Sequence, residues 1–248
     1  MSANLMSLAR SGGKFLKLFG DRKMMKTMPT ARDYVQDGLI AMWDGIENAG
    51  FAADGYQHDS NATKIVNLCS TGDLNLYGNV SIGDDTVFFN GGYGEADFAK
   101  TISETTIERV SDYKIEYNNS QNRVLSILSG TVLCAGIHTF SSTVLNSYAY
   151  ATGSYNRRNY LTSLNPKCVS CSKRALYLDG EDVGGSTTPS IVAHDTDKVI
   201  VAASTDKTAT RKWSFRCIRI YDRELSDSEV MKNRAIDEAR FNLTTPTI

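Results

Sequence analysis

Short runs of alternating hydrophobic and polar residues recur along most of the chain, and turn residues separate them. Runs of this kind occupy 74–77 and 124–128, and a glycine turn at 90–92 follows the apolar run 86–89. A period of two residues is typical of β-strands that bury one face, and closely spaced strands with glycine-rich turns are typical of a β-sandwich. The pattern therefore predicts an all-β domain, with no long helix before residue 226.

A strand followed by a short helix is predicted within 212–241. The alternation of large apolar and polar residues through 213–217 indicates the strand. Ser226 and Glu229 have the spacing of a capping box, in which a hydroxyl and a carboxylate satisfy the free amides at the start of a helix. The predicted apolar stripe of this helix recurs at every fourth residue, at Met231, Ala235 and Ala239.

The stretch IRIYDRELSDSEVMKNRAIDEARF at 218–241 closely resembles the closing strand and helix of laminin-G-like domains in the concanavalin A-like lectin/glucanase superfamily. The run ALYLDGE at 175–181 is similar to a hairpin of the same family, in which both central turn residues adopt positive φ. The resemblance implies a concanavalin A-like jelly-roll β-sandwich of two antiparallel sheets, with a short C-terminal helix. The superfamily includes sugar binders, adhesive modules and glycoside hydrolases, so a function has to be argued from a site.

The N-terminal residues 1–33 differ in charge from the rest of the chain. They contain seven Lys or Arg and two Asp, whereas the remainder contains 20 basic and 26 acidic residues. Apolar residues at helical spacing among these cations predict a basic, partly amphipathic arm (1–33) ahead of the sandwich domain (34–248). The arm is expected to dock on a partner or an anionic surface, and a loosely held leader is the alternative. The predicted docking residues are Phe15, Lys17, Phe19, Arg22 and Lys23.

Overall charge and cysteine usage narrow the expected partners and compartment. The near balance of 27 basic and 28 acidic residues gives no reason to expect nucleic-acid binding. No apolar stretch has the length expected of a secretory signal or a transmembrane segment. The five cysteines are odd in number and scattered, which favours folding in a reducing cytoplasm over a disulfide framework.

Catalytic carboxyl groups are a possibility because the superfamily that the chain resembles contains glucanases. A retaining glucanase needs two carboxyl groups about 5–5.5 Å apart. The nearest stretch, EADFAK at 95–100, has lysine in place of the last glutamate and is predicted to be an acidic loop. The three histidines are scattered, and CVSC at 168–171 lacks the second pair of a zinc ribbon and is predicted to be a hairpin turn. The sequence therefore predicts no catalytic residues and a protein that is not an enzyme.

A calcium ion on the rim of the sandwich is implied by the resemblance, because many laminin-G-like domains hold one with aspartates and backbone oxygens. Aspartates isolated in turns serve turn chemistry instead. No metal and no cofactor is therefore predicted, with Ca²⁺ as the alternative. The aspartates that could contribute are Asp54, Asp59, Asp84, Asp85, Asp195 and Asp197.

Tyrosines beside polar residues in loops are the candidates for glycan binding. A sugar site needs an aromatic platform and a few fixed polar groups. The alternative is that these tyrosines only pack on the surface of the sandwich. The candidates are Tyr56, His58 and Asp59 in one loop, Tyr93 after a glycine turn, and Tyr155, Arg157 and Tyr160 in a third segment.

A lectin-like domain without an export signal fits a virion protein, which is made in the host cytoplasm and reaches the outside on lysis. The sequence therefore favours an accessory structural or adhesion protein of a bacteriophage virion, which displays its sandwich to glycans or proteins. Residues 1–33 would contact other virion proteins or a second copy in a homo-oligomer. A bacterial carbohydrate-binding protein, at the cell surface or extracellular, is the alternative, and a divergent glycoside hydrolase is a second one.

Overall fold

The structure is a computed structural model that describes residues 28–52, 55–69, 72–112, 122–141, 144–151, 154–161, 166–172, 175–183, 193–210 and 212–243. For 51–52, 55–56, 122–123, 139–141, 144–151 and 154–161, only the backbone is described. The predicted docking residues of the N-terminal arm, Phe15, Lys17, Phe19, Arg22 and Lys23, lie outside the described residues.

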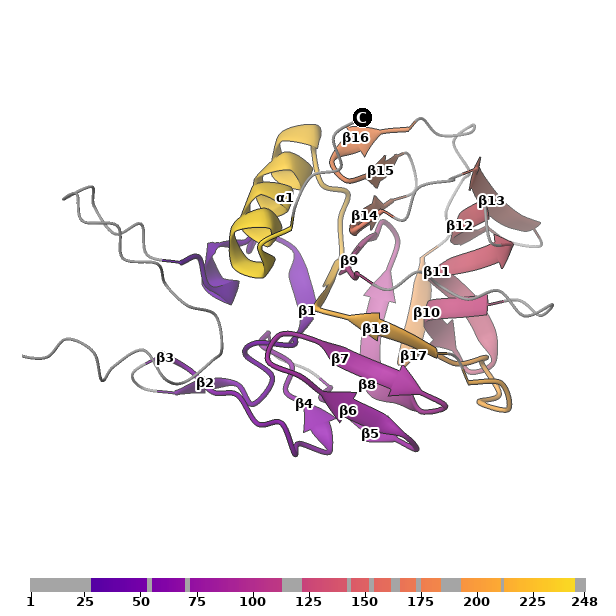
Figure 1. Cartoon of the computed structure of the whole chain (residues 1–248). Coiled ribbons are helices and arrows are strands. Elements are labelled where there is room, and N and C mark those ends of the chain that lie inside the picture. Colours follow the sequence, from indigo (N-terminus) through magenta and orange to yellow (C-terminus); the bar gives the residue numbers. More distant parts are fainter. Residues whose placement is uncertain are drawn as a thin grey trace, which may run out of the picture.

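Two large antiparallel sheets form the body of the domain (Figure 1). The first contains β1 (Leu39–Asp44), β9 (Thr106–Val110), β14 (Cys168–Cys171), β15 (Leu176–Leu178), β16 (Glu181–Asp182) and β19 (Cys217–Tyr221). The second contains β4 (Lys64–Ile65), β5 (Leu74–Tyr77), β8 (Tyr93–Ile102), β10 (Asn122–Ser129), β11 (Val132–Ser141), β12 (Val144–Ala151), β13 (Ser154–Leu161) and β17 (His194–Val201). Their strand orders are β1-β19-β9-β14-β15-β16 and β13-β12-β11-β10-β17-β8-β5-β4.

Smaller elements complete the described structure. A three-stranded sheet has the order β18-β7-β6, from β6 (Val80–Ile82), β7 (Val87–Asn90) and β18 (Lys212–Phe215), and a short pair joins β2 (Phe51–Ala52) to β3 (Gly55–Tyr56). The helices are the 3₁₀ turn η1 (Ala31–Asp33) and α1 (Asp227–Phe241). No helix in this part of the chain is long and apolar enough to cross a membrane.

A hydrophobic core fills the space between the two large sheets. Trp43 and Trp213 are almost completely buried in it. In β8, Ala96 and Phe98 point into the core, and Glu95 lies on the opposite face because successive strand residues alternate. Each large apolar side chain buried in this way contributes on the order of 1.5–3 kcal/mol. The predicted all-β sandwich with one C-terminal helix is confirmed.

Helix α1 covers the outer face of the six-stranded sheet, but with a different side from the one predicted. The predicted stripe is exposed, and Met231 has 51% of its surface accessible. The prediction is wrong because the side of α1 that faces the sheet contains charged residues, and their partners on the sheet are buried. A prediction from the spacing of apolar residues alone cannot identify such a side. The buried side consists of Val230, Asn233, Arg234, Ile236, Asp237, Arg240 and Phe241.

Two local predictions are confirmed. The Glu229 carboxylate accepts hydrogen bonds from the amide and the hydroxyl of Ser226, at 2.9 and 3.0 Å, at the start of α1. Asp179 and Gly180 join β15 to β16 with φ of 52° and 89°, the positive values that a type I′ turn requires.

The residues before β1 pack on the sandwich. Ala31 is buried, and its amide donates to Glu47 Oε1 at 3.1 Å. Tyr34 is also buried, directly after the predicted boundary between residues 33 and 34. Packing is therefore continuous across that point in the described residues, and the division into arm and sandwich stays a prediction.

Candidate functional site

A stacked aromatic pair lies on the outer face of the eight-stranded sheet. Tyr77 ends β5 and Tyr93 begins β8, and the register places them directly opposite each other. Leu74 and Ala96 on the same two strands point into the core, so the alternation puts the tyrosines on the opposite face. Their ring centroids are 5.0 Å apart with an interplanar angle of 19°, and Tyr77 is 44% exposed. Tyr93 is half-buried against a cluster of Leu128, Leu133, Ile200 and Ala203, so Tyr77 supplies most of the exposed aromatic surface.

Gly92 makes this close approach of β5 and β8 possible. A Cβ atom at this position would lie 2.5 Å from the Tyr77 carbonyl oxygen and 2.8 Å from the Asn79 carbonyl oxygen. The end of a flexible side chain could move to relieve such a contact, but these backbone oxygens cannot move without shifting the strand. Glycine is therefore required for Tyr93 to follow the turn and meet Tyr77.

Charged groups stand next to the aromatic pair. Lys198 Nζ lies 2.8 Å from Glu95 Oε1, and Lys207 Nζ pairs with Glu95 Oε2. The Lys207 ammonium is also 5.8 Å from the centroid of the Tyr93 ring, within the range of a cation–π interaction. These five residues, Tyr77, Tyr93, Glu95, Lys198 and Lys207, form the tyrosine–lysine site.

The electrostatics of the site keep Glu95 ionised. Burial alone would raise the pKa of Glu95, but hydrogen bonds and charge from Lys198 and Lys207 lower it below its usual value. The hydrogen bond to Glu95 raises the pKa of Lys198. Two ammonium groups thus face one carboxylate, and about a third of each lysine side chain is exposed.

The loop 204–210 holds Lys207 in place. Lys207 has a φ of 61°, the left-handed region that non-glycine residues seldom adopt. Its amide donates to the Ser204 carbonyl at 2.9 Å, and the Asp206 carboxylate accepts from the Thr208 hydroxyl at 2.9 Å. Hydrogen bonds from Ser204 and Thr208 lower the pKa of Asp206 to about 2. The loop is therefore fastened by its own hydrogen bonds.

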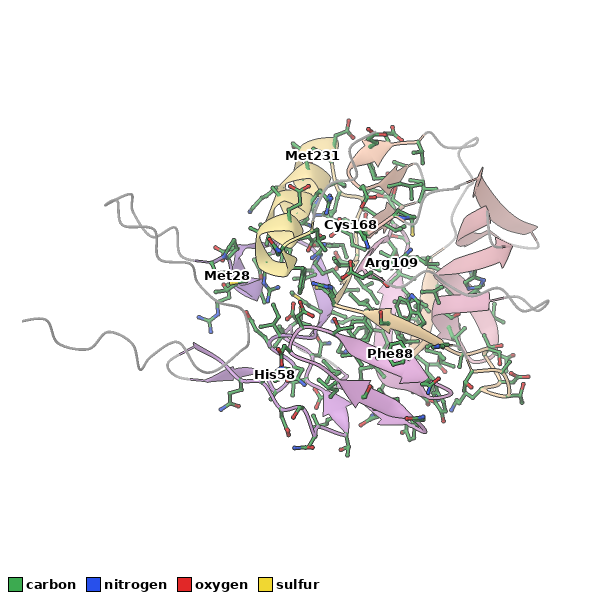
Figure 2. All side chains as sticks on the ribbon, viewed as in Figure 1. Met28, His58, Phe88, Arg109, Cys168 and Met231 are labelled. Carbon is green, nitrogen blue, oxygen red and sulfur yellow. The ribbon has the colours of Figure 1, made fainter. Side chains whose placement is uncertain are left out.

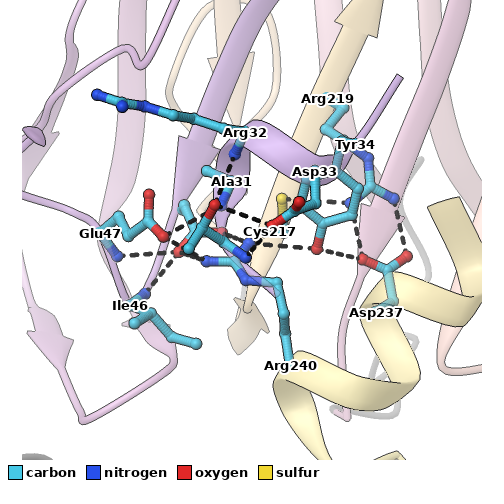
Figure 3. Close-up of polar contacts among 12 residues, drawn as sticks. Ala31, Arg32, Asp33, Tyr34, Ile46, Glu47, Cys217, Arg219, Asp237 and Arg240 are labelled. Carbon is cyan, nitrogen blue, oxygen red and sulfur yellow. Dashed lines mark hydrogen bonds and ion pairs between the residues drawn. The ribbon is translucent and has the colours of Figure 1, made fainter. Parts of the chain in front are cut away.

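A separate network of buried charges fixes α1 to the six-stranded sheet (Figure 3). Arg219 donates to Glu108 Oε2 at 2.8 Å and to both Asp237 carboxylate oxygens at 2.7 and 2.8 Å. Arg240 bridges Asp44 at 2.7 Å and Glu47 at 3.2 Å. All of these side chains are nearly inaccessible, so the network serves helix attachment and is closed to an external ligand.

The loop that holds His58 and Asp59 is built by local hydrogen bonds. Asn48 donates to the Asp59 carbonyl at 2.7 Å and accepts from the Asp59 amide at 2.9 Å, and the Asp59 carboxylate accepts from the Asn61 amide at 2.8 Å. His58 is exposed, with Nδ1 3.1 Å from the Ile46 carbonyl oxygen (Figure 2). The side chain of Tyr56 lies outside the described residues, so its place beside them stays a prediction.

The third predicted group lies at the other end of the sheet from Tyr93. Tyr155, Arg157 and Tyr160 belong to β13, whose backbone alone is described. Four strands separate β13 from β8 in the sheet order, which corresponds to roughly 24 Å at the usual strand spacing of about 4.8 Å. The structure therefore does not join the predicted candidates into one site.

Two predicted loops are strands in the structure. Residues 95–100 lie inside β8, where Glu95 and Asp97 share the outer face, because this stretch alternates through Ala96 and Phe98. The CVSC run forms β14 and not a turn. Its two cysteines belong to hydrophobic clusters on opposite faces of the sheet, so they cannot bind one metal ion together.

Four of the predicted calcium aspartates, Asp59, Asp85, Asp195 and Asp197, have other partners. Asp85 pairs with Arg216 at 2.7 Å, Asp195 accepts from the Thr101 hydroxyl, and Asp197 accepts from the Gly130 amide. Asp54 lies outside the described residues. Where side chains are described, no group of three or more His, Cys, Asp or Glu residues could hold a metal ion.

Comparisons with known proteins find structural similarity without sequence similarity. No protein-family model and no curated protein sequence matches the chain. Trypanosoma rangeli sialidase in complex with sialic acid is similar at 16% identity and a TM-score of 0.58, over 85% of this chain and 34% of the sialidase chain. The binding domain of botulinum neurotoxin DC in complex with SialylT is similar at 11% identity and a TM-score of 0.59, over 83% of this chain and 52% of the toxin-domain chain. The same domain in complex with rat synaptotagmin II is similar at 12% identity and a TM-score of 0.59, over 82% of this chain and 52% of the toxin-domain chain.

The chain thus spans about a third of the length of the sialidase and half that of the toxin domain. At these identities the likeness shows the fold alone, and none of these structures is named as a laminin-G-like or concanavalin A-like protein. The sialidases correct one prediction. The prediction that the protein is not an enzyme is contradicted, because solved structures that share this fold are sialidases, which are enzymes. The absence of a glucanase-type carboxylate motif excludes one mechanism and does not extend to others.

Proposed function

We propose that this protein is a glycan-binding module and that the tyrosine–lysine site contacts the sugar. The observation that carries the proposal is the stacked pair of Tyr77 and Tyr93 on the outer sheet face, in which Tyr77 is exposed and Tyr93 is half-buried. Sugar rings have apolar faces that pack on aromatic rings, while their hydroxyls need fixed polar partners. Glu95 and Lys198 supply such partners next to the rings.

The comparisons support the proposal. One similar structure is a sialidase in complex with sialic acid, and another is a toxin binding domain in complex with SialylT. A domain of this fold therefore occurs in proteins that were solved with such ligands, of which the chain matches 34% and 52% of the length. The site in this chain rests on its own residues, because fold similarity does not locate a site.

The finer identity remains part of the proposal. The motifs at 175–181 and 218–241 support a laminin-G-like domain of concanavalin A-like type. We propose that the domain is displayed on a bacteriophage virion, with 1–33 as the docking arm. Support comes from the charge contrast between 1–33 and the remainder, and from five cysteines that form no disulfide with one another, as expected of folding in a reducing compartment. A bacterial carbohydrate-binding protein is the alternative, and association with purified virions distinguishes the two.

Glycan-array binding followed by calorimetric titration tests the proposed function. Tyr77→Ala removes the exposed ring and should weaken binding by about two- to twelvefold, since aromatic contacts contribute roughly 0.5–1.5 kcal/mol. Met231→Ala is the matched control, because Met231 is an equally exposed large side chain on α1. Binding that Tyr77→Ala leaves unchanged would contradict the proposed site, and binding lost in a Tyr56→Ala or Tyr155→Ala variant would favour the other predicted candidates.

A further inference from the structure

We propose that the tyrosine–lysine site selects acidic glycans, with Lys207 as the residue that binds the sugar carboxylate. This inference rests on the proposed function and specifies its ligand class. The geometry that carries it is a lysine held beside a stacked aromatic pair by an internal carboxylate.

The charge balance of the site favours an anion. Glu95 uses one carboxylate oxygen for Lys198 and the other for Lys207, so one negative charge faces two positive charges. Lys198 has Asp97 opposite it in the register, and this second carboxylate offsets its charge. Among the described residues, Lys207 forms an ion pair only with Glu95, because the carboxylate of the adjacent Asp206 accepts hydrogen bonds from the Ser204 and Thr208 hydroxyls. The ammonium with less compensating charge is therefore that of Lys207.

The position of Lys207 is maintained at a conformational cost. Its φ of 61° places it in the left-handed region, which is unfavourable for a non-glycine residue. Backbone strain of this kind clusters at binding and active sites. The strained turn brings the ammonium to 5.8 Å from the Tyr93 ring and into contact with Glu95, while about a third of the side chain stays exposed.

An ammonium group has three donors, and Glu95 occupies one of those on Lys207. The remaining donors are available to a ligand next to the rings of Tyr77 and Tyr93. A sugar carboxylate, as in a sialic or uronic acid, accepts such charge-assisted hydrogen bonds more strongly than a hydroxyl does. Because Glu95 and the loop 204–210 fix the lysine beforehand, little conformational entropy is lost on binding.

The test uses pairs of glycans that differ by a carboxylate: 3′-sialyllactose against lactose, and oligogalacturonate against its methyl ester. The full-length protein should bind the acidic member of at least one pair about tenfold more tightly. Lys207→Asn removes the cation, and asparagine tolerates the left-handed backbone. This variant should abolish the preference, so that the acidic and the neutral member of each pair bind with equal affinity. Lys232→Gln on the exposed side of α1 removes the same charge and should keep the preference.

The outcomes separate this inference from the proposed function. If neutral glycans bind through Tyr77 but acidic ones gain nothing, or if Lys207→Asn keeps the preference, the inference fails and the proposed function stands. If no glycan of either kind binds, or if Tyr77→Ala changes no binding, both fail. The preference should also decrease between about 0.05 and 0.5 M salt because screening weakens exposed charge pairs.

Discussion

Tyr77 and Tyr93 lie opposite each other on β5 and β8 with their ring centroids 5.0 Å apart. Phe98, on the same strand as Tyr93, points into the core. Tyr77 and Tyr93 instead stack on the solvent side, next to a lysine that a strained loop holds in place. This pair is the feature from which the proposed function follows.

Gly92→Ala is expected to disrupt the pair. The added Cβ would meet the Tyr77 carbonyl oxygen at 2.5 Å, so β5 must move and the rings lose their alignment. We expect a loss of about 1–3 kcal/mol in the free energy of unfolding, together with weakened glycan binding. Urea denaturation and calorimetric titration measure the two effects.

Gly83→Ala serves as the control for that substitution. Gly83 belongs to the adjacent β6–β7 turn, and the nearest atom to its added Cβ is the Thr86 carbonyl oxygen at 3.7 Å, an ordinary contact. Its free energy of unfolding should stay within about 0.5 kcal/mol of the original protein. If the two substitutions lowered the free energy of unfolding equally, the contact between the added Cβ and the Tyr77 carbonyl oxygen would not be the cause of the loss.

Arg219→Met tests the buried charge network. The substitution leaves Glu108 and Asp237 buried without their shared cation, which should lower the free energy of unfolding by about 3–5 kcal/mol. Arg223→Met is the comparison, because Arg223 pairs with Glu229 at the partly exposed start of α1. That pair should contribute at most about 1 kcal/mol. Chemical denaturation of both variants measures the difference, and similar losses would rule out a special role for the buried network.

Glu229 should make the stability depend on pH in the acidic range. Hydrogen bonds from Arg223 and Ser226 lower the pKa of Glu229 to about 2. Because the folded-state pKa lies below the unfolded value of about 4.3, the stabilisation is complete above that value. It is lost as the pH falls toward 2. The stability difference between the protein and Glu229→Gln should therefore shrink between pH 5 and about pH 2. A difference that stays constant over this range would contradict the assigned role.

Much of the fold could be predicted because period-two alternation and turn glycines are local signals. The capping box at Ser226 and the turn at Asp179–Gly180 were predictable for the same reason. The contact face of α1 was not, because its partners lie far away in the sequence. Asn233 bonds to Glu108 across 125 positions, and a pattern-based prediction places such polar residues at the surface.

The candidate site was predictable only in part. Tyr93 could be identified from the glycine turn that precedes it. Tyr77 is the last residue of a recognisable alternating strand, so the outward direction of its side chain could also be predicted. Lys207 gave no signal, because its role depends on a loop that folds over a distant strand. Glu95 was assigned to a loop because neighbouring acidic residues and a preceding glycine turn resemble one.

Solution NMR of the isotopically labelled protein tests the central claim most directly. Titration with the matched glycan pairs should shift the aromatic signals of Tyr77 and Tyr93 and the amide signal of Lys207 more than any others. The account would be contradicted if these signals stayed unchanged while those of His58 and Asp59, or of residues 154–161, responded to the sugar. It would be contradicted equally if no signal responded to any glycan of either pair.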